Sequence, residues 1–162
     1  MGAESHGRGG AARAPLISDA GGGDGDVLRT LFREYAAWLG PQGWFADLEG
    51  ELAALPGGYE ALLVARIDGE IVGCVALRRL PDGECEMKRL YVRPGSRGSG
   101  TGRALVEASI ARARELGHRV MRLDTLPSMD TARVLYLSLG FRPIGKYNDN
   151  PTEGVLFFEL TL

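Results

Sequence analysis

The chain has 162 residues, of which 44% are hydrophobic and 25% are charged. This composition is typical of one soluble globular domain and excludes fibrous and wholly disordered proteins. The formal net charge of −2 argues against a nucleic-acid partner, and no apolar run approaches the roughly 18 residues that cross a membrane. Because the first residues also lack the apolar segment of a signal peptide, we expect a cytoplasmic protein with no membrane partner.

The N-terminal third is predicted to contain a tail, a short strand and two helices. Residues 1–14 are Gly, Ala and Arg without an apolar pattern, which predicts a flexible tail. A short strand is expected at 15–20. Apolar residues then recur every three or four positions, which predicts a helix over 27–40 with Asp26 as its N-cap. A weaker helical pattern follows over 45–55.

The next segment has the pattern of an antiparallel meander. Three strands are expected, at 61–67, 71–80 and 85–92. Two Asp-Gly pairs, 68–69 and 82–83, separate them, and Asp-Gly between apolar runs is a strong hairpin signal.

The two cysteines lie on successive strands of this meander. The hairpin register sets Cys74 opposite Tyr91 and Cys85 opposite Leu80, which is too far apart for a disulfide. Both are predicted to be buried thiols in a reducing compartment. With no histidine nearby they do not form a zinc site, and no metal cofactor is expected.

The glycine-rich stretch RGSGTG leads into a third helix and a further strand. Apolar residues over 103–116 form one helix face, and Gly117 is placed to end it. The strand expected at 119–125 follows a helical crossover, so it should lie parallel to the strand RLYV at 89–92.

The C-terminal part adds a helix and a pair of strands. A helix is expected over 128–140, with Ser128 at its cap, and strands are expected at 141–147 and 154–160. Residues 15–162 therefore form a single α/β (α+β) domain, a mixed sheet with helices on its faces.

The motif RGSGTG at 97–102 suggests a site for negative charge at a helix N-terminus. A P-loop needs a lysine after GxxxxG, but Gly95 and Gly100 are followed by Thr101. A Rossmann fingerprint would use Asp124 for a ribose, yet its third glycine is out of step, so it remains a minor alternative. The other alternative is a glycine-rich turn that binds no ligand and only caps the helix.

Basic residues gather around this motif. Residues 88–122 carry nine basic and two acidic side chains. A solvated helix face accounts for Arg112 and Arg114. Arg93, Arg97 and Arg103 bracket the glycines instead, where a compact polyanion suits them better than nucleic acid.

Two motifs carry a resemblance to a known family. Arg97, Gly100 and Gly102 spell RxxGxG after a strand that ends in LYVRP. In this the sequence resembles the GNAT superfamily of acyl-CoA-dependent N-acyltransferases, whose loop of this form receives the pyrophosphate of coenzyme A on backbone amides.

The stretch SMDTARVLYLSLGF is similar to a later helix of the same family. Ala132, Tyr136, Gly140 and Phe141 fall in step with the family pattern. Met129 stands where the family usually has Asn, so a polar contact to the cofactor is expected to be missing.

The resemblance implies a fold and a cosubstrate. The fold is a GNAT-like mixed, mostly antiparallel sheet of six to seven strands, flanked by about four helices, with a parallel splayed strand pair at the cofactor site. The cosubstrate is acetyl-CoA, whose thioester oxygen is polarised by a backbone N–H of the strand before the loop. The residues expected to bind it are Leu90, Tyr91, Val92, Arg97, Gly98, Ser99, Gly100, Thr101, Gly102 and Arg103.

Two side chains are candidates for proton transfer. Tyr136 matches the family's proton donor to the leaving thiolate, although the helix spacing also suits a tyrosine packed in the core. For the base, Glu86 is the first choice and Glu84, in the turn, the second.

The strand pattern supports Glu86 and offers an alternative. By alternation Glu86 shares a face with Lys88, Leu90 and Val92, where it could take a proton from an amine directly or through a water. In the hairpin register it could instead pair with Arg79, its cross-strand neighbour.

The sequence thus predicts an acetyl-CoA-dependent N-acetyltransferase that acts by direct transfer to a primary amine in a ternary complex. The alternative is a non-catalytic regulatory module that binds coenzyme A or a nucleotide. The partner is expected to be an amine-bearing acceptor, a small molecule rather than a protein, in a pocket lined by 35–45 and 147–151. A homodimer is left open.

Overall fold

A computed structural model describes residues 13–162 of the chain, so most of the predicted tail at 1–14 lies outside the described residues. The strands are β1 (Leu16–Asp19), β2 (Ala61–Ile67), β3 (Glu70–Leu80), β4 (Glu84–Val92), β5 (Val120–Thr125), β6 (Arg142–Ile144) and β7 (Leu156–Thr161). The helices are α1 (Gly25–Leu39), α2 (Leu48–Ala54), α3 (Thr101–Glu115) and α4 (Asp130–Ser138). Short 3₁₀ turns are η1 (Gly22–Asp24), η2 (Gly40–Gln42), η3 (Pro81–Gly83) and η4 (Pro94–Ser96).

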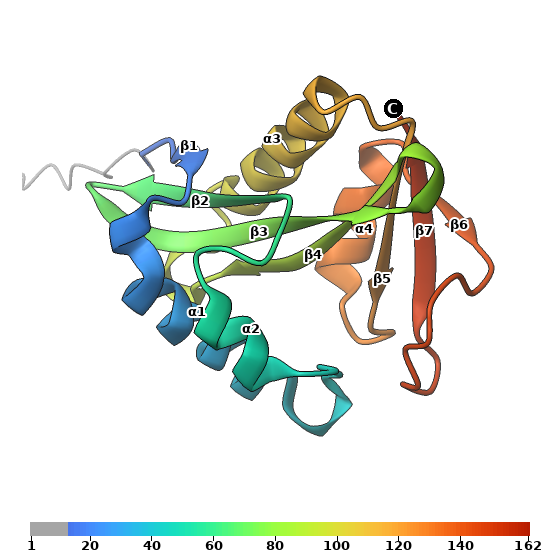
Figure 1. Cartoon of the computed structure of the whole chain (residues 1–162), viewed down its shortest axis with the longest axis horizontal. Coiled ribbons are helices and arrows are strands. Elements are labelled where there is room, and N and C mark those ends of the chain that lie inside the picture. Colours follow the sequence, from blue (N-terminus) through green and yellow to red (C-terminus); the bar gives the residue numbers. More distant parts are fainter. Residues whose placement is uncertain (1–12) are drawn as a thin grey trace, which may run out of the picture.

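The seven strands form one mixed sheet in the order β1-β2-β3-β4-β5-β7-β6. All neighbours are antiparallel except β4 and β5, which run parallel. These two strands pair only at Glu84–Glu86 with Val120–Arg122, and beyond that point they diverge (Figure 1). The predicted fold, with its splayed parallel pair, is therefore confirmed.

Helices cover both faces of the sheet (Figure 1). The apolar face of α1, with Leu28, Leu31 and Phe32, packs together with Leu52 of α2 against one side of the central strands. The other face carries α3 and part of α4 over a second cluster that includes Leu105. Burial of these apolar stripes is the main force that holds the layers together.

Two predicted helix caps are wrong. Asp24, not Asp26, is the N-cap residue of α1, while Asp26 lies in the first turn and hydrogen-bonds Arg29. In α4 the N-cap is Met129 rather than Ser128, and no side chain caps it. The start of each helix differs from the predicted one by one or two residues, because a preceding turn rather than a capping side chain sets where the helix begins.

The hairpin of β3 and β4 contains a bulge that the sequence did not reveal. Cys74 lies opposite Tyr91 as predicted, but Cys85 lies opposite Arg79 instead of Leu80. The register slips between Cys74 and Ala76, where β4 carries one extra residue. Near this point Arg89 adopts a left-handed conformation with φ of 58°, which is unusual for a residue with a side chain.

The bulge changes which side chains share a face. Leu90 and Val92 pack into the core beneath α3, together with Met87. Glu86 points to the opposite side, so the prediction that it shares a face with Leu90 and Val92 is wrong. Its cross-strand partner is Arg78 rather than Arg79, whose guanidinium instead binds Glu60.

The cysteines are free and buried, as predicted, and burial raises the pKa of Cys74 to about 12. Among residues 13–162, no group of three or more His, Cys, Asp or Glu could hold a metal ion. Over the same residues, no helix is long and apolar enough to cross a membrane.

Candidate active site

The glycine loop joins β4 to α3 and presents backbone N–H groups that have no partner among residues 13–162. Gly98 and Gly100 have φ of 78° and 82°, and Gly100 is the N-cap residue of α3 with no side chain capping the helix. The N–H groups of the first turn therefore lack intrahelical partners. A Cβ on either glycine would meet nothing within 4 Å, so it is the left-handed backbone that requires glycine here.

Hydrogen bonds within the loop fix its shape. The hydroxyl of Ser99 donates to the carbonyl oxygen of Ser96 at 2.7 Å and lies 2.9 Å from the hydroxyl of Thr101. At Gly102 an added Cβ would lie 3.9 Å from the side chain of Val92, an ordinary contact distance, so space alone does not require glycine there. A rigid turn that ends in a free helix N-terminus is a suitable site for a phosphate group.

The arginines beside the loop already have partners. The guanidinium of Arg97 lies over the ring of Trp38 at 4.6 Å, and its Nε donates to the carbonyl oxygen of Val92. Arg103 pairs with Glu107 on the next turn of α3. Both arginines lie near the helix N-terminus, and their contact with a cofactor stays a prediction.

A pocket opens where β4 and β5 diverge. It is lined by Tyr35, Leu39, Gly43, Trp44, Met87, Lys88, Arg89, Leu90, Leu123, Asp124, Thr125, Leu126, Met129, Ala132, Tyr136 and Asn150. These residues come from both sides of the sheet, so the pocket passes through the gap between the strands.

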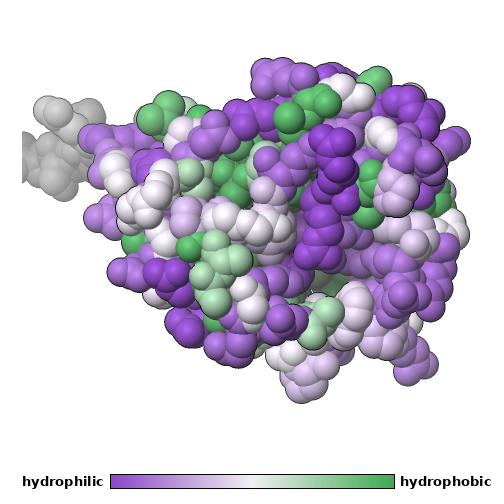
Figure 2. Space-filling model, in the orientation of Figure 1, coloured by the Kyte–Doolittle hydropathy of each residue, from purple (hydrophilic) through white to green (hydrophobic). Residues whose placement is uncertain are grey.

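The face of the molecule shown in Figure 2 is mostly hydrophilic and is hollowed between the α2 side and the β5 side. The predicted segments 35–45 and 147–151 both contribute to the pocket, through Tyr35, Trp44 and Asn150 among others. In anticipation of the roles proposed below, we call the part of the pocket lined by Met129, Ala132 and Tyr136 the donor half. The acceptor half is the part lined by Tyr35, Leu39, Trp44, Lys88, Arg89, Asp124 and Asn150.

Tyr136 forms part of the donor half. Its ring packs against Phe141 and Phe158, with centroids 5.6 and 6.5 Å away, and only 5% of the residue is exposed. Among the described residues, none hydrogen-bonds to its hydroxyl, which reaches the pocket. Burial raises the pKa of Tyr136, so the hydroxyl stays protonated and is available as a donor. Core packing and proton donation are thus compatible here.

Met129 occupies the position where the family pattern has Asn. It lines the same half of the pocket, and its thioether sulfur accepts a 3.6 Å contact from the hydroxyl of Thr125. A thioether is only a weak hydrogen-bond acceptor, so Met129 is a poor substitute for the polar side chain of Asn.

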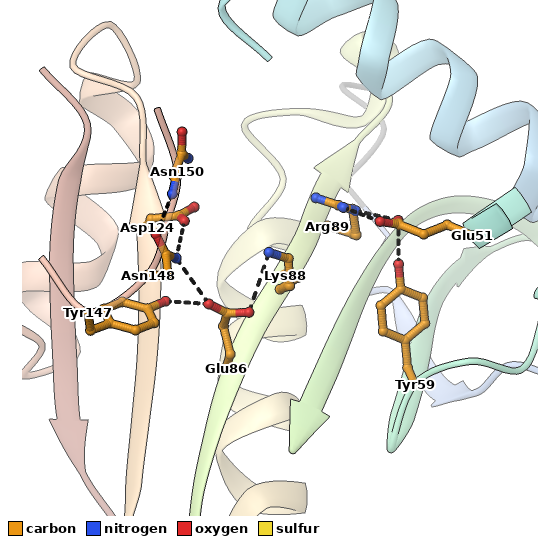
Figure 3. Close-up of polar contacts among 9 residues, drawn as sticks. All are labelled: Glu51, Tyr59, Glu86, Lys88, Arg89, Asp124, Tyr147, Asn148 and Asn150. Carbon is orange, nitrogen blue, oxygen red and sulfur yellow. Dashed lines mark hydrogen bonds and ion pairs between the residues drawn. The ribbon is translucent and has the colours of Figure 1, made fainter. Parts of the chain in front are cut away.

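Glu86 lies at the centre of a polar network beneath the acceptor half (Figure 3). It is 4% exposed and accepts hydrogen bonds from Tyr147 at 2.7 Å and Asn148 at 3.3 Å, while Lys88 lies 3.4 Å away. Glu86 does not itself line the pocket, although Lys88 does. Burial and the nearby carboxylate of Glu86 raise the pKa of Tyr147.

Asn148 joins this network to a second carboxylate. Its amide donates to Glu86 and, at 2.6 Å, to Asp124, whose side chain does line the pocket. From the sequence, Asp124 is a candidate only for a ribose contact, and its place beside Asn148 was not predicted. Glu84, the second candidate base, pairs with Arg122 at 2.9 Å.

Arg89, the residue with the left-handed backbone, is fixed by a buried ion pair. Its Nε and Nη2 donate to the two oxygens of Glu51 at 2.9 and 2.6 Å, and Tyr59 donates to the same carboxylate (Figure 3). Its guanidinium also lies 4.5 Å from the ring centre of Phe45. Burial alone would raise the pKa of Glu51, but the hydrogen bond and charge of Arg89 lower it below its usual value. Helix α2 is thereby tied to the bulge.

Comparison with known proteins identifies the family. The model of the Acetyltransferase (GNAT) family matches residues 26–141, well over half of the chain. The chain belongs to this family. An uncharacterized N-acetyltransferase of Schizosaccharomyces pombe is 39% identical over 145 residues, which cover 86% of this chain and 89% of that protein.

Solved structures of GNAT proteins have the same fold. A GCN5-related N-acetyltransferase from Kribbella flavida superposes with a TM-score of 0.74 at 26% identity, covering 92% of this chain and 98% of that one. The protein yncA of Salmonella typhimurium, solved with its cofactor acetyl-CoA, has a TM-score of 0.73 at 24% identity, covering 92% and 94%.

Membership of the GNAT family decides between the alternatives left open by the sequence. The chain is an N-acetyltransferase, so an enzyme is favoured over a regulatory module without turnover. The P-loop and Rossmann interpretations of the glycine motif are excluded by the fold, because β4 is antiparallel to β3 and the sheet is mostly antiparallel.

Proposed function

We propose that this GNAT protein is an acetyl-CoA-dependent enzyme that transfers an acetyl group to a primary amine by direct transfer in a ternary complex. One observation carries the proposal: a single pocket connects Tyr136 in the donor half with Lys88 and Asp124 in the acceptor half. Two substrates that enter from opposite faces of the sheet would meet within it, so no covalent enzyme intermediate is needed.

The residues of the loop and of β4 fit coenzyme A. The free N–H groups at the start of α3, from Thr101 to Arg103, suit a pyrophosphate, and the adjacent glycines leave room for its approach. Leu90 lines the pocket where β4 leaves β5, so the backbone of Leu90–Val92 would bind the chain that carries the acetyl thioester. When bound, acetyl-CoA supplies the acetyl group and a thiolate leaving group.

The reaction forms a C–N bond and breaks a C–S bond, and two protons must move. The amine loses a proton when it attacks, and the thiolate gains one when it leaves. Tyr136 supplies the second proton from a hydroxyl that reaches the pocket. Glu86 accepts the first through a water, because its carboxylate lies behind the pocket wall next to Lys88.

The acceptor half favours a small molecule over a folded protein. Its walls are Tyr35, Leu39 and Trp44 from the α1 region and Asn150 from the segment at 147–151. Side chains from several elements would surround the acceptor there, as in a small-molecule pocket rather than on a flat docking surface.

Initial-velocity kinetics test the mechanism. Thiol release would be measured while acetyl-CoA and amine are varied independently, and the protein mass would be recorded after incubation with acetyl-CoA alone. Direct transfer predicts intersecting reciprocal plots and no acetylated protein. Parallel plots together with a stable acetyl adduct would instead indicate a covalent intermediate and refute the ternary complex.

A further inference from the structure

Two cations of β4 stand side by side in the acceptor half. Lys88 and Arg89 are consecutive in sequence, yet both line the pocket, because the bulge near Arg89 breaks the alternation of the strand. Their side chains are only 11% and 8% exposed, so each positive charge lies deep in the protein. A buried charge is costly unless its donors find partners.

Both cations keep donors that no other residue in the described part of the chain uses. The guanidinium of Arg89 binds Glu51 through Nε and Nη2, and among the described residues none accepts from Nη1. No buried side-chain nitrogen or oxygen in the described part of the chain lacks a partner, so Nη1 must retain access to solvent. Arg89 lines the pocket, so the pocket can give Nη1 that access. Lys88 has three donors and contacts Glu86 at 3.4 Å, which leaves at least two of them.

The other wall of the acceptor half carries the opposite charge. Figure 3 shows Lys88 and Arg89 on β4, with Asp124 and Asn150 across from them, and all four residues line the pocket. Asp124 accepts a hydrogen bond from Asn148 at 2.6 Å and still lines the pocket, so its carboxylate can receive a further donor.

This arrangement of charge matches a particular class of amine. A simple amine would pair with Asp124 and leave the donors of Lys88 and Arg89 facing it unpaired. We infer that the acceptor carries a carboxylate close to its amino group, as an α-amino acid does. Lys88 and Arg89 bind the carboxylate through charge-assisted hydrogen bonds, and Asp124 orients the amino group. This inference rests on the proposed acetyl transfer and specifies its substrate.

The test is a matched series of acceptors. The common α-amino acids, their carboxamides and the corresponding decarboxylated amines would each be assayed for thiol release from acetyl-CoA at a fixed pH. The amino group of a carboxamide is less basic than that of the acid, so a larger fraction of it is unprotonated at the assay pH. Without a carboxylate site, the amide would therefore be the better acceptor. We expect the reverse, a kcat/KM for the best acid at least about tenfold above that of its amide.

Two variants assign the preference to residues. The first variant is Lys88→Gln. The second combines Arg89→Gln with Glu51→Gln, so that both charges of the buried pair are removed together. Each variant is expected to raise the KM of the acid about tenfold or more. The KM of the amide should change less than about threefold. The control is Arg79→Gln, an exposed partner of Glu60 outside the pocket, which should leave both values unchanged.

The outcomes separate this inference from the proposed function. Equal use of acid and amide, thiol release only with amines that lack a carboxylate, or a preference that both variants retain would overturn the carboxylate site while acetyl transfer stands. If the double variant fails to fold, Lys88→Gln alone decides. An absence of thiol release with every amine, acids included, would count against acetyl transfer itself.

Discussion

The hydroxyl of Tyr136 can be removed with little effect on the fold, which makes Tyr136→Phe a clean test of the proton donor. The ring would still pack against Phe141 and Phe158. Because no described residue hydrogen-bonds to the hydroxyl, its loss leaves no buried partner unsatisfied. We therefore expect the free energy of unfolding to change by less than about 1 kcal/mol.

The catalytic effect should be much larger. A positioned general acid contributes about 10²–10⁴-fold to a rate, and a water in the pocket can replace part of that contribution in the variant. We expect kcat to fall by about 10²–10³-fold, which corresponds to roughly 2.7–4 kcal/mol of barrier. The affinity for coenzyme A should change less than about threefold, since the loop at 97–102 is untouched.

Three measurements on one preparation check this reasoning. Thiol release gives kcat, calorimetric titration gives the affinity for coenzyme A, and thermal unfolding reports the fold. A variant that folds, binds coenzyme A normally and retains more than about a third of the wild-type kcat would refute Tyr136 as the donor. If the free energy of unfolding falls by as much as the activation barrier rises, Tyr136 has a packing role instead.

Three further perturbations follow from the geometry. Gly100→Ala places a side chain at φ of 82°, at a strain of about 1–2 kcal/mol. It should weaken coenzyme A binding about fivefold or more in a calorimetric titration, whereas Gly95→Ala, at a position whose φ is not positive, should leave binding unchanged. Equal effects of the two variants would contradict the role of the left-handed loop. Glu86→Gln should lower the plateau of the pH–rate profile and shift the profile to higher pH, and an unchanged profile would leave Glu86 as a structural residue. Glu51→Gln should lose roughly 2–4 kcal/mol of stability at pH 7, since it leaves Arg89 buried without its partner. The pKa of Glu51 is lowered in the folded state, so its contribution exists above the usual carboxyl value and is lost as the pH falls through the lowered one; a difference in melting temperature that does not narrow on acidification would contradict this.

Local patterns were enough to predict most elements of the fold. The Asp-Gly pairs at 68–69 and 82–83 mark turns whose geometry depends on neighbouring residues alone, and the two hairpins are present. The apolar spacing before Gly40 likewise predicts α1, because a helix face is a property of one segment.

The bulge of β4 is different, because nothing in its composition signals it. Arg89 adopts a conformation that usually needs glycine, and it is held there by Glu51, 38 positions away. A contact between segments so distant in sequence has no local pattern. As the bulge shifts the register, the predicted partners of Cys85 and Glu86 were wrong by one residue.

The donor half of the site was more predictable than the acceptor half. The glycine loop and Tyr136 belong to motifs of fixed spacing, and the structure places the loop at the start of α3 and Tyr136 in the pocket. Lys88, Arg89 and Asp124 come together only through the bulge and the splay of two strands. Their chemistry depends on tertiary geometry, which the sequence alone does not display.

Product analysis tests the central claim most directly. The enzyme would be incubated with acetyl-CoA and the best acceptor of the amine series, and the free thiol and the acetylated amine would be counted by titration and mass spectrometry. Acetyl transfer predicts one acetylated amine for each thiol and almost no thiol when the amine is omitted. Thiol release that is equally fast without amine, or that yields no acetylated amine, would contradict it.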